Sequence, residues 1–223
     1  MKELQQAITD IGQRLVQCSE PCDGVVHDAP SGILPRCLIL ERPERTERGC
    51  LVAGINPGRS RQRERDFYKE KGPSYEVVTT YWHQNVNRFA YYKRLRQFVD
   101  AVGLTGPIIW SDLAKCENSP DVERLIPLQT LRICAGRFLQ NELQKTPKDW
   151  PVIGVGREAY NALAYLEPSR TVIGIPHPTG SWGQFSSLFV NDSLRDNVAE
   201  GIANALSTDT LPLAVWVSAG GVR

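Results

Sequence analysis

Four short apolar runs are the feature that most constrains how this chain can fold. The runs span residues 50–55, 107–110, 151–154 and 171–175. Each is too short to be a typical helix, and their β-branched residues and the turn residues after them favour strands. Apolar residues at helical spacing lie between and after the runs, at residues 87–102, 128–143, 157–165 and 187–206. The sequence therefore predicts strands alternating with helices.

This alternation predicts a three-layer α/β/α fold with a central, mainly parallel four-stranded sheet, because right-handed crossovers place helices on both faces of such a sheet. A chain of 223 residues with 41% apolar content can bury one core, so we predict a single domain over residues 1–223. Ligands of such folds bind beyond the carboxyl ends of the strands. We therefore expect the functional residues in the segments that directly follow the four runs.

The first 17 residues predict an amphipathic helix and no targeting segment. Leu4, Ile8, Ile11 and Leu15 fall on one stripe of that helix, and the segment lacks the apolar core of a signal peptide. No run approaches the roughly 18 apolar residues of a membrane span. We expect a monomeric, cytoplasmic protein without membrane contact, in which six cysteines are thiols or metal ligands rather than disulfides.

Two motifs follow strands and carry polar groups suited to catalysis. The first, GINPG, places Asn56 just beyond a strand, and its glycines Gly54 and Gly58 allow close approach of a ligand to the backbone. The second, IPHPTGS, holds His177 between two prolines that stiffen its backbone. Alone, the first is a common tight turn and the second an ordinary histidine. Two such groups at one edge of a sheet favour a catalytic site.

GINPG and HPTGS resemble the two signature motifs of the uracil-DNA glycosylase superfamily. SDLAKC, LRICAGRFLQNEL and VIGVGREAYNAL are similar to segments of its iron-sulfur-containing branch, so the resemblance runs from about residue 18 to residue 206. It implies an enzyme that flips a nucleotide out of DNA and hydrolyses the bond between base and sugar. By the resemblance, Asn56 holds the water, His177 stabilises the leaving base, and Gly54 and Ile55 belong to the base pocket.

The motifs contain no lysine that could form a Schiff base, so we predict a monofunctional enzyme that leaves an abasic site. The base-reading position departs from the family, because Asp112 stands where the resemblance places an asparagine that pairs with uracil. A carboxylate cannot donate to O4 of uracil, whereas it can accept from the N4 amino group of cytosine. We therefore expect a 5-modified cytosine, as in some phage genomes, and a role in antiviral defence. The alternative substrate is uracil, as in DNA repair. The alternative role of Asp112 is merely to cap the following loop while another group reads the base.

Four cysteines match ligand positions of the iron-sulfur branch. They are Cys18, Cys22, Cys116 and Cys134. By the resemblance they hold a [4Fe-4S] cluster with a structural role, since such a cluster needs four thiolates. Three residues separate the first two cysteines where the family has two, so Cys37 is an available substitute, and four unrelated thiols are the alternative. Cys50 is better explained as a buried apolar residue.

Residues 59–84 show no clear periodicity, and we predict a long polar loop there that contacts DNA. Arg59, Arg61, Arg63 and Arg65 alternate with polar residues in a pattern suited to phosphate binding, although a solvated loop is the alternative. A local cluster is required, because the formal net charge is only +1.

Aromatic residues near both motifs are candidates for contacts with a flipped base. Phe67 or Tyr68 could stack on the base, and packing in the core is the alternative for either ring. In the loop after His177, Trp182 or Phe185 could enter the duplex in place of the flipped nucleotide. The loop residues expected to contact DNA with them are Thr179, Gly180 and Ser181. Two other functions stay open: a binding protein that senses a modified base without catalysis, and a hydrolase of free nucleotides.

Overall fold

The computed structural model describes residues 1–36, 38–120, 126–188, 192–207, 213–218 and 221–222. A seven-stranded sheet in the order β2-β4-β3-β6-β7-β8-β9 runs through the fold. Its strands are β2 (Leu38–Glu41), β3 (Cys50–Gly54), β4 (Ile108–Asp112), β6 (Val152–Val155), β7 (Val172–Ile175), β8 (Ala214–Ser218) and β9 (Gly221–Val222).

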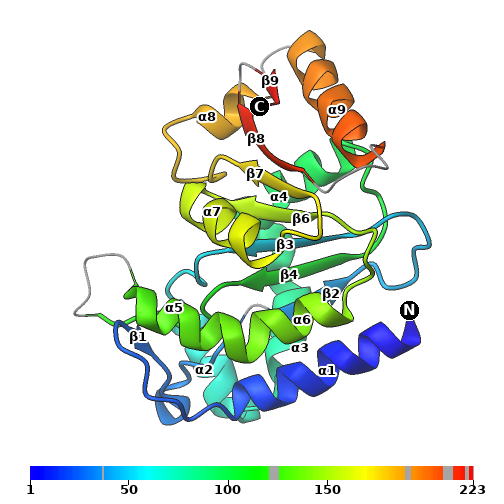
Figure 1. Ribbon diagram of the computed structural model, residues 1–223. Coiled ribbons are helices and arrows are strands. Elements are labelled where there is room, and N and C mark those ends of the chain that lie inside the picture. The colour runs from blue at the N-terminus through cyan, green and yellow to red at the C-terminus, as the bar shows by residue number, and fades with distance from the viewer. Residues whose placement is uncertain (37, 121–125, 189–191, 208–212, 219–220, 223) are drawn as a thin grey trace. The chain divides into compact units, whose positions relative to one another are not determined.

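The structure confirms the predicted α/β class, with a mainly parallel sheet flanked by helices (Figure 1). Strand β6 pairs in parallel with β3 and with β7, and strand β7 pairs in parallel with β8. Among the pairings of this sheet with a described register, only that of β8 with β9 is antiparallel. All four predicted strands are present, as β3, β4, β6 and β7. The predicted number of four was wrong, because β2, β8 and β9 extend the sheet.

The contacts of the chain divide it into two compact units, and the single domain predicted from the sequence stays a prediction. The first unit comprises residues 1–40, 55–85 and 110–146, and the second comprises residues 41–54, 86–109 and 147–223. Each unit is assembled from segments that are interleaved along the sequence.

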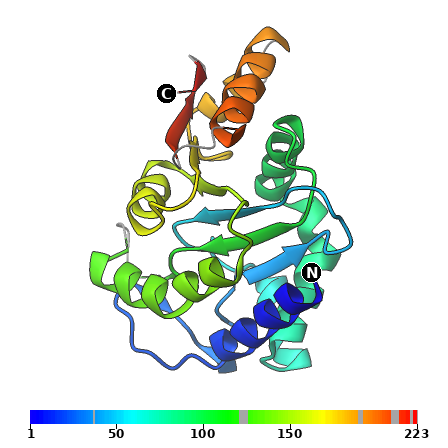
Figure 2. The same cartoon turned by 45° about the vertical axis from the view of Figure 1, so that its right-hand side comes forward.

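The first unit is mainly helical. It contains α1 (Lys2–Val16), the 3-10 turn Ala29–Ser31, α2 (Gln62–Lys71), α3 (Tyr75–Asn85), α5 (Leu128–Cys134), the π-helical turn Ala135–Leu139 and α6 (Gln140–Lys145). Helix α1 packs against α6 and α3, as Figures 1 and 2 show, and the predicted stripe of Leu4, Ile8, Ile11 and Leu15 is buried. Strands β1 (Val25–Val26) and β5 (Glu117–Asn118) form a short antiparallel ribbon.

The prediction of a long loop over residues 59–84 was wrong, because this segment forms α2 and α3. The buried face of α2 consists of Glu64 and Tyr68 rather than an apolar stripe. Glu64 accepts a hydrogen bond from Arg36 at 2.7 Å, and the Tyr68 hydroxyl donates to it at 3.1 Å. Helix α2 is therefore held by polar contacts, which hydrophobic periodicity cannot detect.

The second unit contains strands β3, β6, β7, β8 and β9. Its helices are α4 (Ala90–Ala101), which follows the 3-10 turn Val86–Arg88, α7 (Arg157–Leu166), α8 (Gln184–Ser187) and α9 (Asp192–Ser207). Helix α7 packs closely on β6 and β7, and a Cβ atom at Gly154 would lie 2.6 Å from the Cα of Tyr160. The C-terminal segment, for which the sequence predicted no element, contributes β8 and β9. Within the described ranges, no helix has the length and apolar character needed to span a membrane.

Candidate active site and thiol cavity

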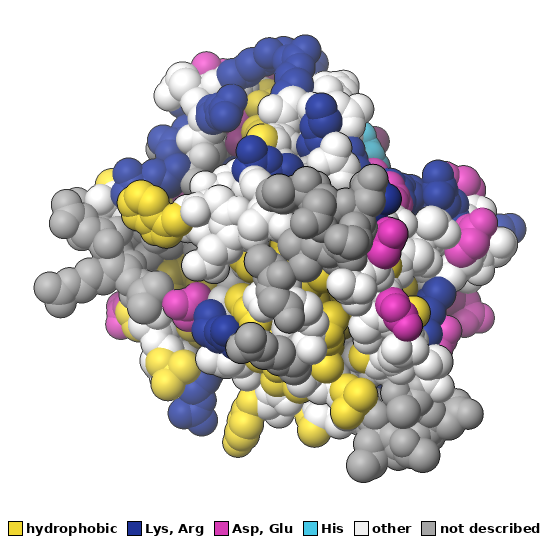
Figure 3. Space-filling view, turned by 90° about the horizontal axis from the view of Figure 1, so that it is seen from above, with side chains coloured by type: hydrophobic (Ala, Val, Ile, Leu, Met, Phe, Trp, Pro, Cys, Tyr) yellow, Lys and Arg dark blue, Asp and Glu magenta, His cyan; other side chains and the backbone are white. Residues whose placement is uncertain are grey.

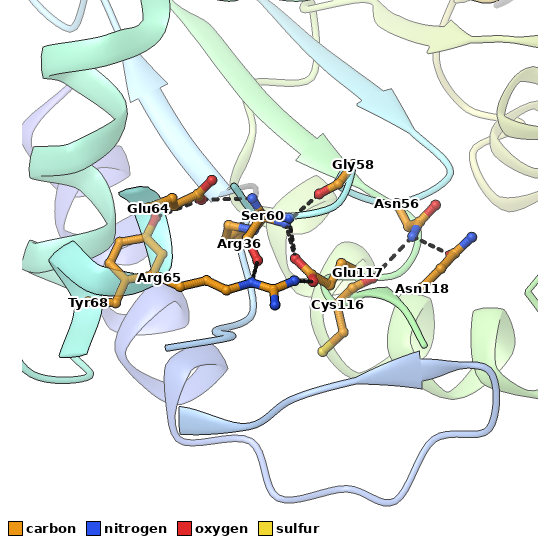
Figure 4. Close-up of polar contacts among 10 residues, drawn as sticks. All are labelled: Arg36, Asn56, Gly58, Ser60, Glu64, Arg65, Tyr68, Cys116, Glu117 and Asn118. Atoms are coloured by element: carbon orange, nitrogen blue, oxygen red, sulfur yellow. Dashed lines mark hydrogen bonds and ion pairs between the residues drawn. The ribbon is translucent and has the colours of Figure 1, made fainter. Parts of the chain in front are cut away.

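Asn56 lies two residues beyond the end of β3, in the first unit. The segment after β3 runs beside the segment after β4, because the backbone N–H of Ala114 donates to the carbonyl oxygen of Ile55 at 2.8 Å. The Asn56 Nδ2 donates to Asn118 Oδ1 at 2.8 Å and to the carbonyl oxygen of Cys116 at 3.2 Å. In Figure 4 the Asn56 amide oxygen points away from these two partners. The amide is thus oriented with its acceptor directed elsewhere, as holding a water requires.

The loop that follows Asn56 is tied to a buried carboxylate. Glu117 is 1% exposed and accepts from the backbone N–H of Ser60 at 2.6 Å, from Arg36 at 2.6 Å and from Arg65 at 3.0 Å. Arg36 also donates to the carbonyl oxygen of Gly58, as Figure 4 shows. Two guanidinium groups and a backbone donor compensate the desolvation of this carboxylate. The loop is therefore fixed by side chains that the sequence analysis did not single out.

The four predicted phosphate-binding arginines differ in their surroundings. Arg59, Arg61 and Arg63 are exposed. Arg65 is half-buried, and its guanidinium donates to Ser60 Oγ at 2.7 Å as well as to Glu117. Arg65 thus holds the loop together through its Nε and Nη2 atoms, and phosphate binding by Arg65 stays a prediction.

The two candidate stacking residues on α2 also differ. Tyr68 is 3% exposed, it donates to Glu64, and its burial raises the pKa of its phenol. The prediction that Tyr68 could stack on a base was therefore wrong. Phe67 is half-buried, and its ring centroid lies 5.3 Å from that of Tyr81. Phe67 also lines a surface hollow together with Arg63 and Gln84, so it stays a candidate.

Asp112, the candidate base reader, is the last residue of β4 and is 4% exposed. Its backbone carbonyl accepts from Lys115 Nζ at 2.7 Å. Ala114, two residues after Asp112, donates its backbone N–H to the carbonyl oxygen of Ile55, the residue before Asn56. Asp112 and Asn56 therefore belong to adjoining segments of the same unit.

His177, in the second unit, lies two residues beyond the end of β7 and is half-buried. The backbone N–H of Thr179 donates to its Nδ1 at 3.3 Å, which assigns the proton of the neutral ring to Nε2. Burial lowers the pKa of the imidazole, so the ring is neutral at neutral pH. A Cβ atom at Gly180 would lie 3.2 Å from Nδ1, so the glycine leaves room for this arrangement.

The loop after His177 exposes one of its two candidate wedge residues. Trp182 is fully exposed at 101%, and its φ of 51° lies in the left-handed region, which costs a residue other than glycine on the order of 1–3 kcal/mol. Phe185 is 2% exposed, and its ring lies 6.3 Å from that of Phe98. The prediction that Phe185 could enter the duplex was therefore wrong. Thr179 and Gly180 are exposed, and Ser181 Oγ accepts from the Phe185 backbone N–H at 3.1 Å.

The four predicted ligand cysteines line one cavity of the first unit, and all four are free thiols. Burial raises the pKa of Cys116 to about 12, and the other three thiols contribute to that increase. Burial also raises the pKa values of Cys22 and Cys134. Cys22, Cys116 and Cys134 are therefore protonated at neutral pH, and a metal group that bound them would release protons. Cys37 lies outside the described residues, and Cys50 is buried in β3.

The cavity that the four cysteines line also contains His27. No three His, Cys, Asp or Glu side chains of the described residues lie close enough together to bind one metal ion. A [4Fe-4S] cluster uses one thiolate for each iron, so its ligands lie farther apart. His27 lines the same cavity and its Nδ1 lies 2.7 Å from the carbonyl oxygen of Cys18, while its Nε2 is buried without a hydrogen-bond partner in the described part of the chain. An unpartnered buried nitrogen beside four thiols is consistent with a bound group.

No model of a protein family and no curated protein matches the chain. The resemblance to uracil-DNA glycosylases stays a prediction that rests on the two motifs and the segments between them.

Proposed function

We propose that the protein is a monofunctional DNA glycosylase that removes a modified base and leaves an abasic site. The observation that carries the proposal is the state of His177, whose neutral ring accepts at Nδ1 and therefore presents an N–H at Nε2. A preorganised donor of this kind stabilises negative charge that develops on a departing base. By the resemblance, Asn56, with its Nδ2 held and its Oδ1 directed elsewhere, supplies the acceptor for a water.

The proposed reaction is a hydrolysis through an oxocarbenium-like sugar. The bond between C1′ of the sugar and the base nitrogen breaks, and its electron pair leaves with the base. Water held by the Asn56 amide adds its oxygen to C1′, and the proton it loses is balanced by the proton that the departing base gains. An amide is a weak base, so most of the rate enhancement must come from stabilising the leaving base through His177.

The buried carboxyl group of Asp112 favours a cytosine edge over a uracil edge. It can accept from the N4 amino group of cytosine, whereas against O4 of uracil it would face an unmatched acceptor at a cost of about 1–3 kcal/mol. An enzyme that removed ordinary cytosine would damage its own genome. A 5-modified cytosine is therefore the proposed substrate, and defence against phages that carry such bases is the proposed role.

Asp112→Asn is expected to move the base preference towards uracil by about 10-fold to 100-fold, because the new amide can donate to O4. Abasic sites would be counted on matched oligonucleotides with uracil, cytosine or 5-hydroxymethylcytosine at one position. Asp10→Asn, at an exposed carboxylate on α1, is the control and should leave the preference unchanged. An unchanged preference in Asp112→Asn would remove this residue from base recognition.

Exposed positive groups and one exposed aromatic ring support DNA as the substrate. Arg59 and Arg63 present guanidinium groups at the surface, and Trp182 is available to replace a flipped nucleotide. Figure 3 shows a face of the molecule on which several Lys and Arg side chains lie near one another. Local positive charge of this kind can bind phosphates although the net charge is only +1.

We also propose that Cys18, Cys22, Cys116 and Cys134 hold a [4Fe-4S] cluster that links the N-terminal segment to the core. Protein purified without oxygen is expected to absorb visible light and to contain about four iron atoms per chain. Cys134→Ser should lose both signals, whereas Cys50→Ser, at a cysteine outside the cavity, should keep them. Iron-free protein with full activity would contradict the proposed cofactor.

The proposed function is tested by incubating the protein with duplex and single-stranded DNA containing each base and then counting abasic sites. Abasic sites on modified-cytosine DNA are expected, with a rate that falls steeply as salt rises. Equal rates on uracil DNA would instead favour a repair glycosylase. Tight binding without cleavage would favour a sensor, and activity on free nucleosides would favour a nucleotide hydrolase.

A further inference from the structure

We infer that Asn118 is a positioning residue that sets the orientation of the Asn56 amide. The inference rests on the proposed function, because it concerns how the water-holding group is aimed. It adds a residue to the site that neither motif contains, since Asn118 lies in β5, between β4 and α5 in the sequence.

The geometry in Figure 4 carries the inference. The side-chain oxygen of Asn118 accepts from Asn56 Nδ2 at 2.8 Å, and the carbonyl oxygen of Cys116 accepts from the same nitrogen at 3.2 Å. Both contacts are to acceptors, so they distinguish the nitrogen end of the amide from its oxygen end. A rotation of the amide by half a turn would place Asn56 Oδ1 against two acceptors and is therefore disfavoured.

The segment that supplies both acceptors is itself rigidly held. Asn118 pairs with Val25 in the ribbon of β5 with β1, and the backbone N–H of Ser119 donates to the carbonyl oxygen of Gly24 at 3.0 Å. Between the two acceptors, Glu117 binds Ser60, Arg36 and Arg65. Residues 116–118 therefore bind both Asn56 and the loop that follows it.

This arrangement also connects the amide to the thiol cavity. The side chain of Cys116 lines the cavity, while its carbonyl oxygen accepts from Asn56. The shorter of the two contacts is made by the side chain of Asn118, which does not line the cavity, so a substitution of Asn118 can remove this contact without altering the cavity.

Asn118→Leu preserves much of the side-chain volume but removes the acceptor. It is expected to lower kcat on modified-cytosine DNA by about 10-fold to 30-fold with little change in KM, because a misaimed water affects the chemical step rather than binding. Asn118→Asp keeps an acceptor and should restore kcat to within about threefold of the original. Ser119→Ala, at the next position of the same segment, is the matched control and should behave as the unsubstituted protein.

A double-mutant cycle with Asn56→Ala separates positioning from a general structural role. If Asn118 acts only through Asn56, Asn118→Leu will lower kcat no further in the Asn56→Ala background. An equal loss in both backgrounds, or an unchanged kcat in Asn118→Leu alone, would overturn the inference while leaving the glycosylase intact. Absence of base release by the unsubstituted protein would instead contradict the proposed function, so the two failures are distinguishable.

Discussion

His177→Ala is expected to lower kcat for base release by about 10²-fold to 10³-fold, the loss typical of removing one preorganised donor to a developing negative charge. The variant removes the Nε2–H that the Thr179 contact assigns to the neutral ring. Since the proposed mechanism provides only a weak base to activate the water, the rate depends mainly on how well His177 stabilises the negative charge on the leaving base. KM should change little, because the missing contact strengthens mainly in the transition state.

Single-turnover kinetics on DNA with one modified cytosine would measure this loss. His83→Ala is the matched control, because His83 is an exposed histidine on α3 outside the proposed site. Burial already lowers the pKa of His177, so raising the pH from about 7 to about 9 leaves the ring neutral and should not slow its step. A rate that fell about tenfold per pH unit over this range would show that the charged ring is required, against the proposed mechanism.

Glu142→Leu is expected to lower the free energy of unfolding by about 3–5 kcal/mol, because it leaves a buried lysine without its counter-charge. Lys115 Nζ lies 2.8 Å from Oε1 of Glu142, and both side chains are 0% exposed. Ser111 Oγ accepts from the same Nζ at 2.6 Å and donates to Glu142 Oε2. These contacts connect the end of β4 to α6, so the variant removes an electrostatic link inside the first unit.

Urea unfolding of protein samples with equal iron content would measure the change in stability. The double variant Lys115→Met with Glu142→Leu should recover most of the loss, since replacing a buried ion pair by apolar groups of similar size is often neutral. Glu70→Leu, at an exposed carboxylate on α2, should change stability by less than about 0.5 kcal/mol. Equal destabilisation by the single and the double variant would indicate lost packing rather than an unpaired charge.

Hydrophobic patterns predicted the centre of the sheet and missed its edges. Strands β3, β4, β6 and β7 lie where the β-branched runs are, within two residues at each end. Strand β8 has the burial pattern of a partly exposed strand, with Val215 and Val217 buried. The alternation covers only these five residues, which is too short to identify a strand from the sequence.

The local motifs predicted the positions of two candidate site residues relative to the strands. Asn56 and His177 each lie two residues beyond a strand, where the motifs indicated. The residues that orient the first of them were missed, because Asn118 and Glu117 follow Cys116 without any motif of their own. Their roles depend on contacts with residues about 60 positions away in the sequence, such as Asn56 and Ser60. Partners of this kind are set by the tertiary fold rather than by local pattern.

A protein that breaks the bond between base and sugar yields two products in equal amounts, a free base and an abasic site. Mass spectrometry of DNA containing 5-hydroxymethylcytosine, after incubation with the protein, should detect one free base for each abasic site and no strand cleavage. Released nucleotides, strand breaks without free base, or no products despite DNA binding would each show that the protein is not a monofunctional DNA glycosylase.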